Sequence, residues 1–98
     1  MLESAYQAKL IKTLKLRFPG CLVIKNDPSY RQGMPDLLVL HKDRWAALEV
    51  KASAKAKKQP NQEYYVSAMD DMSFAGFIYP ENEEEVLHAL QSAFGSAR

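Results

Sequence analysis

The chain has 98 residues, of which 47% are hydrophobic and 26% are charged, and its formal net charge is +1. This composition is typical of a soluble globular protein and excludes a disordered chain, which carries fewer apolar residues and a larger net charge. No apolar run approaches the ~18 residues of a membrane-spanning helix, and the first four residues lack the basic start of a signal peptide. The length fits one domain, which we expect over residues 1–98. Because the lone Cys21 cannot form an internal disulfide, we expect a reducing, cytoplasmic compartment.

The beginning of the chain predicts a helix followed by a strand. Leu10, Leu14 and Phe18 recur every four residues, which places them on one face of a helix over residues 2–18. The Pro-Gly pair that follows ends this helix. The short apolar run at residues 21–24 is then typical of a buried strand.

Two further strands are expected around a polar connection. Residues 36–40 form an apolar run after a loop that contains Gly33, and residues 41–44 are polar. The next strand covers residues 45–51, where successive side chains point to opposite faces. One face carries Ala46, Leu48 and Val50, and the other carries Trp45, Ala47, Glu49 and Lys51.

The rest of the chain predicts a helix, a strand and a final helix. A proline suits the first turn of a helix over residues 60–72, and residues 74–79 have the composition of a strand. Asn82 and Glu85 have the spacing of a helix N-terminal cap with its reciprocal glutamate, and this helix runs to about Phe94. The order α-β-β-β-α-β-α predicts an α/β fold in which helices flank a mixed sheet.

Pairing of the two central strands brings two carboxylates together. In a hairpin closed symmetrically over its polar connection, Leu40 faces Trp45 and Asp36 faces Glu49. Two carboxylates ~4 Å apart repel by roughly 4 kcal/mol at an effective dielectric near 20. A divalent cation with oxygen ligands would offset this repulsion. Lys51 lies on the same face, so its ammonium can reach the same site.

A third carboxylate, that of Glu3, shares the apolar face of the first helix. It precedes Leu10 by seven residues and Leu14 by eleven, which places it within about 20° of both. We therefore expect Glu3 on the buried face, where a carboxylate needs a partner or a metal. The alternative readings are a strand with a polar edge at Glu49, a turn residue at Asp36, and an N-terminal acid stabilised by the helix dipole at Glu3.

The motif Gly33-Met34-Pro35-Asp36, followed after twelve residues by Glu49-Val50-Lys51, resembles the signature of PD-(D/E)XK nucleases. Within that superfamily it is most similar to the small stand-alone virus-type replication-repair nuclease (VRR-NUC) domain of phage-like proteins. That family also has a glutamate on its first helix and a glutamine opening the next, which Glu3 and Gln62 match, with Gln59 as an alternative. The resemblance covers nearly the whole chain and implies a restriction-endonuclease-like fold. It also implies that Glu3 binds a second metal or a metal-bound water, and that Gln62 places the catalytic lysine or a phosphate oxygen.

The same resemblance implies roles for the central residues. Asp36 and Glu49 would ligate Mg²⁺ or Mn²⁺ together with the backbone carbonyl of Val50, and Lys51 would orient or activate the attacking water. Such an ion polarises the phosphoryl oxygen and lowers the pKa of its bound water. We expect no nucleotide cofactor, because the chain has no glycine-rich phosphate-binding loop.

Basic residues are concentrated in the part of the chain that carries these motifs. Residues 1–58 have twelve Lys or Arg against five acids, a net charge of +7, whereas residues 59–98 have a net charge of −6. This asymmetry predicts an oriented electrostatic surface, and the alternative is two solvated faces of opposite sign.

The loop after the motif has spacing suited to DNA phosphates. Lys55, Lys57 and Lys58 have no acid among them, and Tyr30 and Arg31 have the chemistry to stack on a base or clamp a phosphate. Alternatively, the lysines belong to a solvated loop without a ligand, and Tyr30 and Arg31 lie in or at the rim of the core.

Other aromatic and sulfur-containing residues are expected to be structural. We expect Tyr64, Tyr65 and Met69 to pack the second helix against the sheet, and Cys21 to be a buried strand residue without catalytic function.

Our first hypothesis is therefore a metal-dependent DNA endonuclease. By the resemblance it would be a homodimer acting on branched DNA such as four-way junctions, in the host cytoplasm if it is phage-encoded. The alternative is a nucleic-acid-binding module without catalysis on the same fold. A third possibility is a small α/β interaction domain that has no role on DNA.

Overall fold

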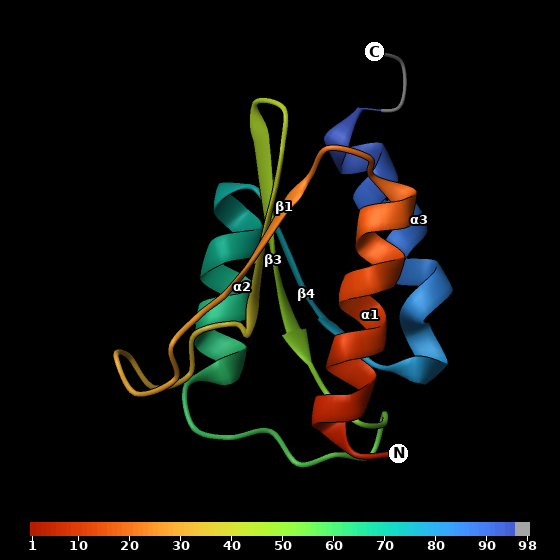
Figure 1. Ribbon diagram of the computed structural model, residues 1–98. Coiled ribbons are helices and arrows are strands. Elements are labelled where there is room, and N and C mark those ends of the chain that lie inside the picture. The colour runs from red at the N-terminus through yellow and green to blue at the C-terminus, as the bar shows by residue number, and fades with distance from the viewer. Residues whose placement is uncertain (96–98) are drawn as a thin grey trace.

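A computed structural model describes residues 1–95, in which four strands form one sheet between helices (Figure 1). The elements follow the predicted order, with one 3₁₀ turn added before the last helix. They are α1 (Glu3–Arg17), β1 (Leu22–Lys25), β2 (Leu37–His41), β3 (Arg44–Val50), α2 (Gln62–Met72), β4 (Phe74–Ile78), η1 (Pro80–Asn82) and α3 (Glu83–Phe94). The protein is therefore a mixed α/β structure with helices flanking a four-stranded sheet.

The sheet has the strand order β1-β2-β3-β4, with β1, β2 and β3 antiparallel and β4 parallel to β3. The β2–β3 register pairs Leu40 with Trp45 and Leu37 with Leu48, which confirms the predicted hairpin register. His41 and Arg44 also pair, so the hairpin loop has two residues where the sequence predicted four. Lys42 in this loop has a φ of 57°, which the tight turn requires.

The two faces of β3 pack against different helical layers, as its alternation predicts. Ala46, Leu48 and Val50 lie in the larger core with residues of α1 and α3, whereas Ala47 packs with Val66 of α2. Figure 1 shows α1 and α3 on one side of the sheet and α2 on the other. Glu49 consequently lies on the face of the sheet that α2 covers.

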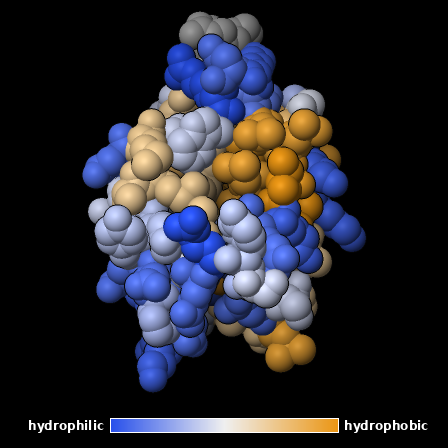
Figure 2. Space-filling view, turned by 90° about the vertical axis from the view of Figure 1, so that its left-hand side faces the viewer, coloured by the Kyte–Doolittle hydropathy of each residue, from blue (hydrophilic) through white to orange (hydrophobic). Residues whose placement is uncertain are grey.

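The strand β1 is an edge strand, and the prediction that it is buried is wrong. Leu22 is 62% exposed and Ile24 is 44% exposed. The reason is the position of α2, which packs on β3 and β4, so that no helix within residues 1–95 covers the same face of β1. Figure 2 shows an apolar patch on this side of the molecule.

Two local predictions at helix starts are also corrected. The helix α2 begins at Gln62, so Pro60 lies before it, and Asn61 between them has a φ of 71°. The predicted Asn82–Glu85 cap does not form. Asn82 instead accepts a hydrogen bond from Tyr79 N at 2.9 Å and donates one to Phe77 O at 3.0 Å, so its side chain closes the end of β4.

Among the helices of residues 1–95, none has both the length and the apolar character needed to cross a membrane. Cys21 is buried beside Leu14, as predicted, but it lies immediately before β1 and not within it.

Candidate active site

Asp36 lies at the open end of the β2–β3 hairpin, where its side chain and its backbone carbonyl both accept hydrogen bonds. Its Oδ2 accepts a hydrogen bond of 2.9 Å from the backbone N–H of Val50, and its carbonyl accepts one of 2.9 Å from Asn26 N. Asn26 also donates from its side-chain amide to Pro35 O at 2.6 Å. The turn after β1 thus fixes the Pro-Asp segment, and one further step of the observed register brings Asp36 opposite Glu49.

Glu49 is a buried carboxylate with half of its hydrogen-bonding capacity unused. Its side chain is 2% exposed, and its Oε2 accepts a hydrogen bond of 2.8 Å from Gln62 Nε2. Its Oε1 is buried and has no hydrogen-bond partner among the described residues. A buried, unsatisfied carboxylate oxygen costs more than the ~1–3 kcal/mol of a neutral polar group. The geometry therefore leaves one oxygen that needs a proton or a cation.

The electrostatic environment of Glu49 favours its neutral form. Burial, and then the neighbouring Asp36 carboxylate, raise the pKa of Glu49 to about 8, while the ammonium of Lys51 acts in the opposite direction. A strongly raised carboxyl pKa beside a second carboxylate is typical of functional sites. Without a bound cation, Glu49 therefore holds a proton near neutral pH.

Lys51 reaches the same site and is almost completely buried. Its side chain is 7% exposed, and its Nζ lies 3.9 Å from Glu49 Oε2 and donates a hydrogen bond of 3.1 Å to the carbonyl of Lys57. Its backbone N–H donates to Ile78 O at 2.9 Å, which continues the β3–β4 pairing. The loop that follows β3 therefore folds back over the ammonium and fixes its position.

The structure distinguishes between the two candidate glutamines. Gln62, on the first turn of α2, donates to Glu49, and its Oε1 accepts a hydrogen bond of 2.8 Å from the backbone N–H of Gln59. Gln59 contributes through its backbone, and Gln62 is the glutamine whose side chain lies at the site.

Gly33 of the Gly-x-Pro-Asp motif packs against the residue that precedes Gln62. A Cβ at position 33 would lie 2.6 Å from Asn61 Cβ and 2.9 Å from Asn61 C, and Gly33 has a φ of +92°. Only glycine fits both the conformation and the approach. This contact ties the loop that carries Asp36 to the start of α2, which carries Gln62.

Glu3 is exposed at the first residue of α1, so the prediction that it lies on a buried face is wrong. It shares the helix face of Leu10 and Leu14, but it is the first residue of α1 and lies before Tyr6, the first buried residue of the helix. Within residues 1–95, no three or more His, Cys, Asp or Glu side chains gather closely enough to hold a metal ion. Glu3 nevertheless makes a small contribution to raising the pKa of Glu49, so it lies at the same end of the sheet.

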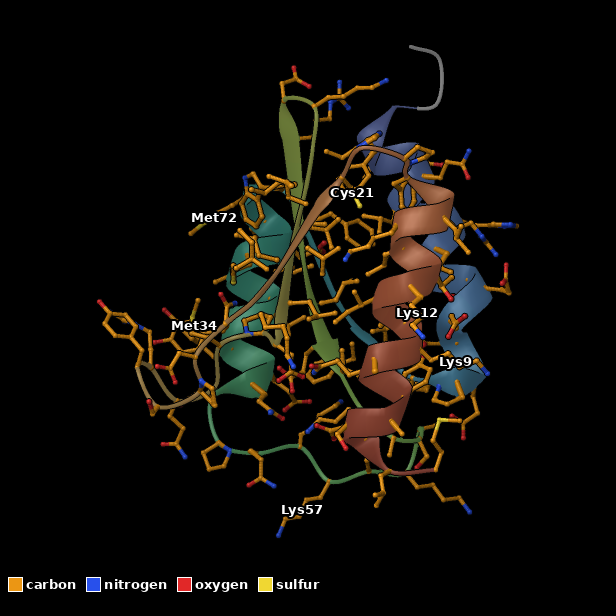
Figure 3. All side chains as sticks on the ribbon, viewed as in Figure 1. Lys9, Lys12, Cys21, Met34, Lys57 and Met72 are labelled. Carbon is orange, nitrogen blue, oxygen red and sulfur yellow. The ribbon has the colours of Figure 1, made fainter. Side chains whose placement is uncertain are left out.

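The loop that follows β3 carries three lysines after Lys51, of which two are exposed and one forms an ion pair. Lys55 and Lys57 are exposed, and Figure 3 shows Lys57 extending away from the body of the protein. Lys58 forms an ion pair of 3.2 Å with Glu63, and its Nζ lies 4.6 Å from the centre of the Phe77 ring. An open hollow of about 630 Å³ adjoins this segment, and it is lined by Lys57, Lys58, Gln59, Pro60, Asn61, Glu63 and Tyr64.

One exposed aromatic residue, Tyr64, lines this hollow, and it was missed at the sequence level. Tyr30 is exposed on the loop between β1 and β2, and Arg31 donates a hydrogen bond of 3.4 Å to the hydroxyl of Tyr65. Tyr64 is 67% exposed, so the prediction that it packs α2 against the sheet is wrong. Tyr64 follows Gln62 by two residues, about 200° around the helix, and this spacing was the available signal that it faces away from the sheet.

The donor set suits a small, hard divalent cation. The Asp36 carboxylate contacts the Val50 peptide, and one oxygen of the Glu49 carboxylate has no hydrogen-bond partner among the described residues. Mg²⁺ is usually held in proteins by one or two such carboxylates. Comparisons with family models, with curated proteins and with solved structures give no match to this chain.

Proposed function

We propose that this protein is a Mg²⁺- or Mn²⁺-dependent DNA endonuclease with the VRR-NUC arrangement of a restriction-endonuclease-like fold. The observation that carries the proposal is the buried Glu49 carboxylate, whose neighbours are Asp36, Lys51 and Gln62. Its Oε1 accepts no hydrogen bond from the described residues, and only a proton shared with Asp36, or a cation, would satisfy it. A purely structural carboxylate would be expected to have its buried oxygens satisfied. An Asp, Glu and Lys set supported by a glutamine also agrees with the resemblance of the motif.

In this proposal each side chain has a separate task. Asp36 and Glu49 hold the cation together with the Val50 carbonyl, and Glu3 acts from the helix end through a metal-bound water. When bound, the cation supplies Lewis-acid chemistry to the phosphoryl group and lowers the pKa of its water. Lys51, positioned by the Lys57 carbonyl, orients the attacking water and stabilises charge on the phosphate.

The DNA would lie across the loop after β3. Lys55 and Lys57 are free to contact phosphates, whereas Lys58 must first give up part of its contact with Glu63. Tyr30 and Arg31 lie on the loop between β1 and β2, before Asp36, where they would contact the flanking nucleotides. We propose branched DNA, such as a four-way junction, as the substrate, and a two-fold homodimer as the form that presents two sites to paired strands.

The test is cleavage of supercoiled plasmid and of a synthetic four-way junction in Mg²⁺, Mn²⁺ or EDTA. We expect metal-dependent cutting that Asp36→Ala abolishes, with stronger cutting of the junction than of a linear duplex of the same sequence. If the protein cuts linear duplex and junction equally, the proposal of branched substrates is wrong while the nuclease proposal stands.

One observation favours a second candidate, a nucleic-acid-binding module without catalysis. The Lys51 ammonium already has a hydrogen-bond acceptor in the Lys57 carbonyl, so the site has a closed arrangement of its own. Salt-dependent DNA binding without cutting in any metal would support this module and contradict the nuclease.

A further inference from the structure

A second hollow lies between α2 and the loop that joins β1 to β2. It has a volume of about 310 Å³, and we call it the α2 hollow; it is lined mainly by Arg31, Met34, Tyr64, Tyr65, Met69 and Met72. Figure 3 shows Met34 and Met72 on the α2 side of the ribbon. Apolar and aromatic side chains with a few polar groups are the usual lining of a ligand site, and such sites begin at about this volume. The α2 hollow therefore has the size and lining of a site for a small, flat, mostly apolar group.

The α2 hollow is close to the candidate active site along both of the segments that form it. Met34 precedes Asp36 by two residues, and Tyr64 follows Gln62, which donates a hydrogen bond to Glu49, by two residues. Two residues of extended chain span at most about 7 Å, and two residues of helix rise by about 3 Å. A group bound in the hollow would therefore be a near neighbour of a phosphate at the carboxylates.

Tyr64 joins the α2 hollow to the open hollow beside Lys57 and Lys58. Its side chain is 67% exposed and lines both hollows. Single-stranded nucleic acids bind to surfaces that combine positive charge for the backbone with aromatic side chains on which the bases stack. The two hollows supply these two chemistries next to each other, with an exposed aromatic ring where they meet.

Arg31 adds a cation to the lining of the α2 hollow itself. It is exposed and forms no ion pair within residues 1–95, and among these residues its guanidinium donates only to the Tyr65 hydroxyl, at 3.4 Å. A guanidinium in this position can pair with a phosphate or stack on a base. The Tyr65 ring in turn meets the Tyr64 ring edge to face, with centroids 5.1 Å apart, which restrains the exposed ring.

The charges in the two linings favour an anionic ligand. They comprise three cations, those of Arg31, Lys57 and Lys58, and one acid, Glu63, which is already paired with Lys58 at 3.2 Å. A neutral apolar peptide could fill the α2 hollow but would leave these cations without a counter-charge. A nucleotide instead carries a flat ring and an anion in one ligand, and so matches both hollows.

We propose that the α2 hollow binds an unpaired nucleobase, stacked on Tyr64, of a DNA strand whose phosphates contact Arg31 and Lys57. A base in a duplex is stacked and paired, so it must be extruded to enter a pocket, and a base that is already single-stranded enters at the least cost. The substrate class is therefore DNA with unpaired nucleotides beside the cleaved phosphate, and Tyr64 is the residue that selects it. This inference rests on the proposed function in taking DNA as the ligand, but it does not require cleavage.

Fluorescence anisotropy in EDTA tests the proposal in the absence of cleavage, with a labelled single strand and a duplex of the same sequence as probes. Tyr64→Ala should raise the dissociation constant for the single strand by at least about fivefold, because a stacking contact is lost. Its dissociation constant for the duplex should stay close to that of the wild type, since lysine–phosphate contacts hold the duplex.

Tyr64→Phe is the matched variant, because it keeps the ring and should bind the single strand as the wild type does. Leu16→Ala is the control for the loss of an exposed side chain, because Leu16 is 81% exposed on α1, on the other side of the sheet. An unchanged circular dichroism spectrum of Tyr64→Ala would show that the variant is folded, as expected from the exposure of Tyr64.

The outcomes separate this proposal from that of the nuclease. If Tyr64→Ala binds the single strand as tightly as the wild type does, or loses affinity for both probes equally, the base site is wrong while the nuclease proposal stands. A selective loss for the single strand in a protein that cuts no DNA would support the base site and contradict the nuclease. A wild type that binds neither probe would overturn both.

Discussion

The side-chain amide of Gln62 donates a hydrogen bond of 2.8 Å to Oε2 of Glu49, which joins the first turn of α2 to the end of β3. This bond fixes one oxygen of the buried carboxylate and leaves the other, Oε1, without a partner among the described residues. The proposed function depends on this division, because the free oxygen is the position at which a cation or a proton must bind.

The stability of the metal-free protein should fall as the pH rises through the titration of Glu49. Its pKa is raised from the usual 4.5 to about 8, so between these values the folded protein holds a proton that the unfolded chain releases. The free energy of unfolding in EDTA should therefore decrease from about pH 4.5 to about pH 8, by up to about 1.4 kcal/mol per pH unit. Denaturant unfolding at several pH values measures this slope.

Glu49→Gln is the control for that experiment, because it keeps the shape of the side chain and cannot titrate. It should flatten the slope and be more stable than the wild type at pH 8 in EDTA. If the free energy of unfolding of Glu49→Gln depends on pH as steeply as that of the wild type, Glu49 is not the titrating group.

Asp36→Asn should also raise the free energy of unfolding in EDTA, since the amide oxygen can still accept a hydrogen bond from Val50 N while the charge beside Glu49 is removed.

Added Mn²⁺ should stabilise the protein, and more strongly at pH 8 than at pH 5. A ligating carboxylate must be deprotonated, so proton and metal compete for Glu49. Thermal unfolding with and without Mn²⁺ reports the shift in Tm, which follows the metal concentration relative to its dissociation constant. A Tm that Mn²⁺ raises equally in the wild type and in the Asp36→Ala variant would place the metal elsewhere.

Gly33→Ala should destabilise the protein more than Gly20→Ala does. Both glycines have positive φ, +92° and +88°, so alanine is strained at either position. Only position 33 adds a close approach, because no atom of the described residues outside the neighbouring positions lies within 4 Å of a Cβ at position 20. We expect a cost of about 1 kcal/mol for Gly20→Ala and clearly more for Gly33→Ala. Equal losses of stability in the two variants would show that the backbone at Asn61 shifts to accommodate the added methyl group.

Lys57→Ala should weaken DNA binding and reduce its salt dependence. Removing one lysine–phosphate interaction lowers the slope of log K against log salt by about 0.9 for duplex DNA. Lys12→Ala is the matched control, because Lys12 is an exposed lysine on α1, where Figure 3 shows it away from Lys57. Lys58→Ala should have a smaller effect than Lys57→Ala, since Lys58 is already paired with Glu63. Fluorescence anisotropy over a salt series gives these slopes.

Much of the fold is predictable because strand periodicity is strict. The alternation of Ala46, Leu48 and Val50 against Ala47 and Glu49 already assigned two faces to β3, and the structure packs them against different helices. The hairpin register follows from the same period of two, because a slip by one residue would reverse every side chain.

Two of the errors, at β1 and at Glu3, share one physical cause, which is that local pattern does not reveal where a layer ends. The apolar sequence of β1 suggested burial, but the width of α2 leaves Leu22 and Ile24 uncovered. Glu3 has the helical phase of the buried residues, but it lies past the edge of the core. Similarly, the choice of Gln62 over Gln59 depends on a hydrogen bond between elements, which spacing alone cannot decide.

The most direct test of the nuclease proposal is the single-turnover cleavage rate of a four-way junction in Mn²⁺, for the wild type, Lys51→Ala and Lys12→Ala. We expect the wild type and Lys12→Ala to cut the junction and EDTA to abolish the cutting, and we expect a rate lower by on the order of 100-fold or more for Lys51→Ala. A wild type that binds the junction without cutting it in any metal, or a Lys51→Ala variant that cuts at the wild-type rate, would contradict the proposal.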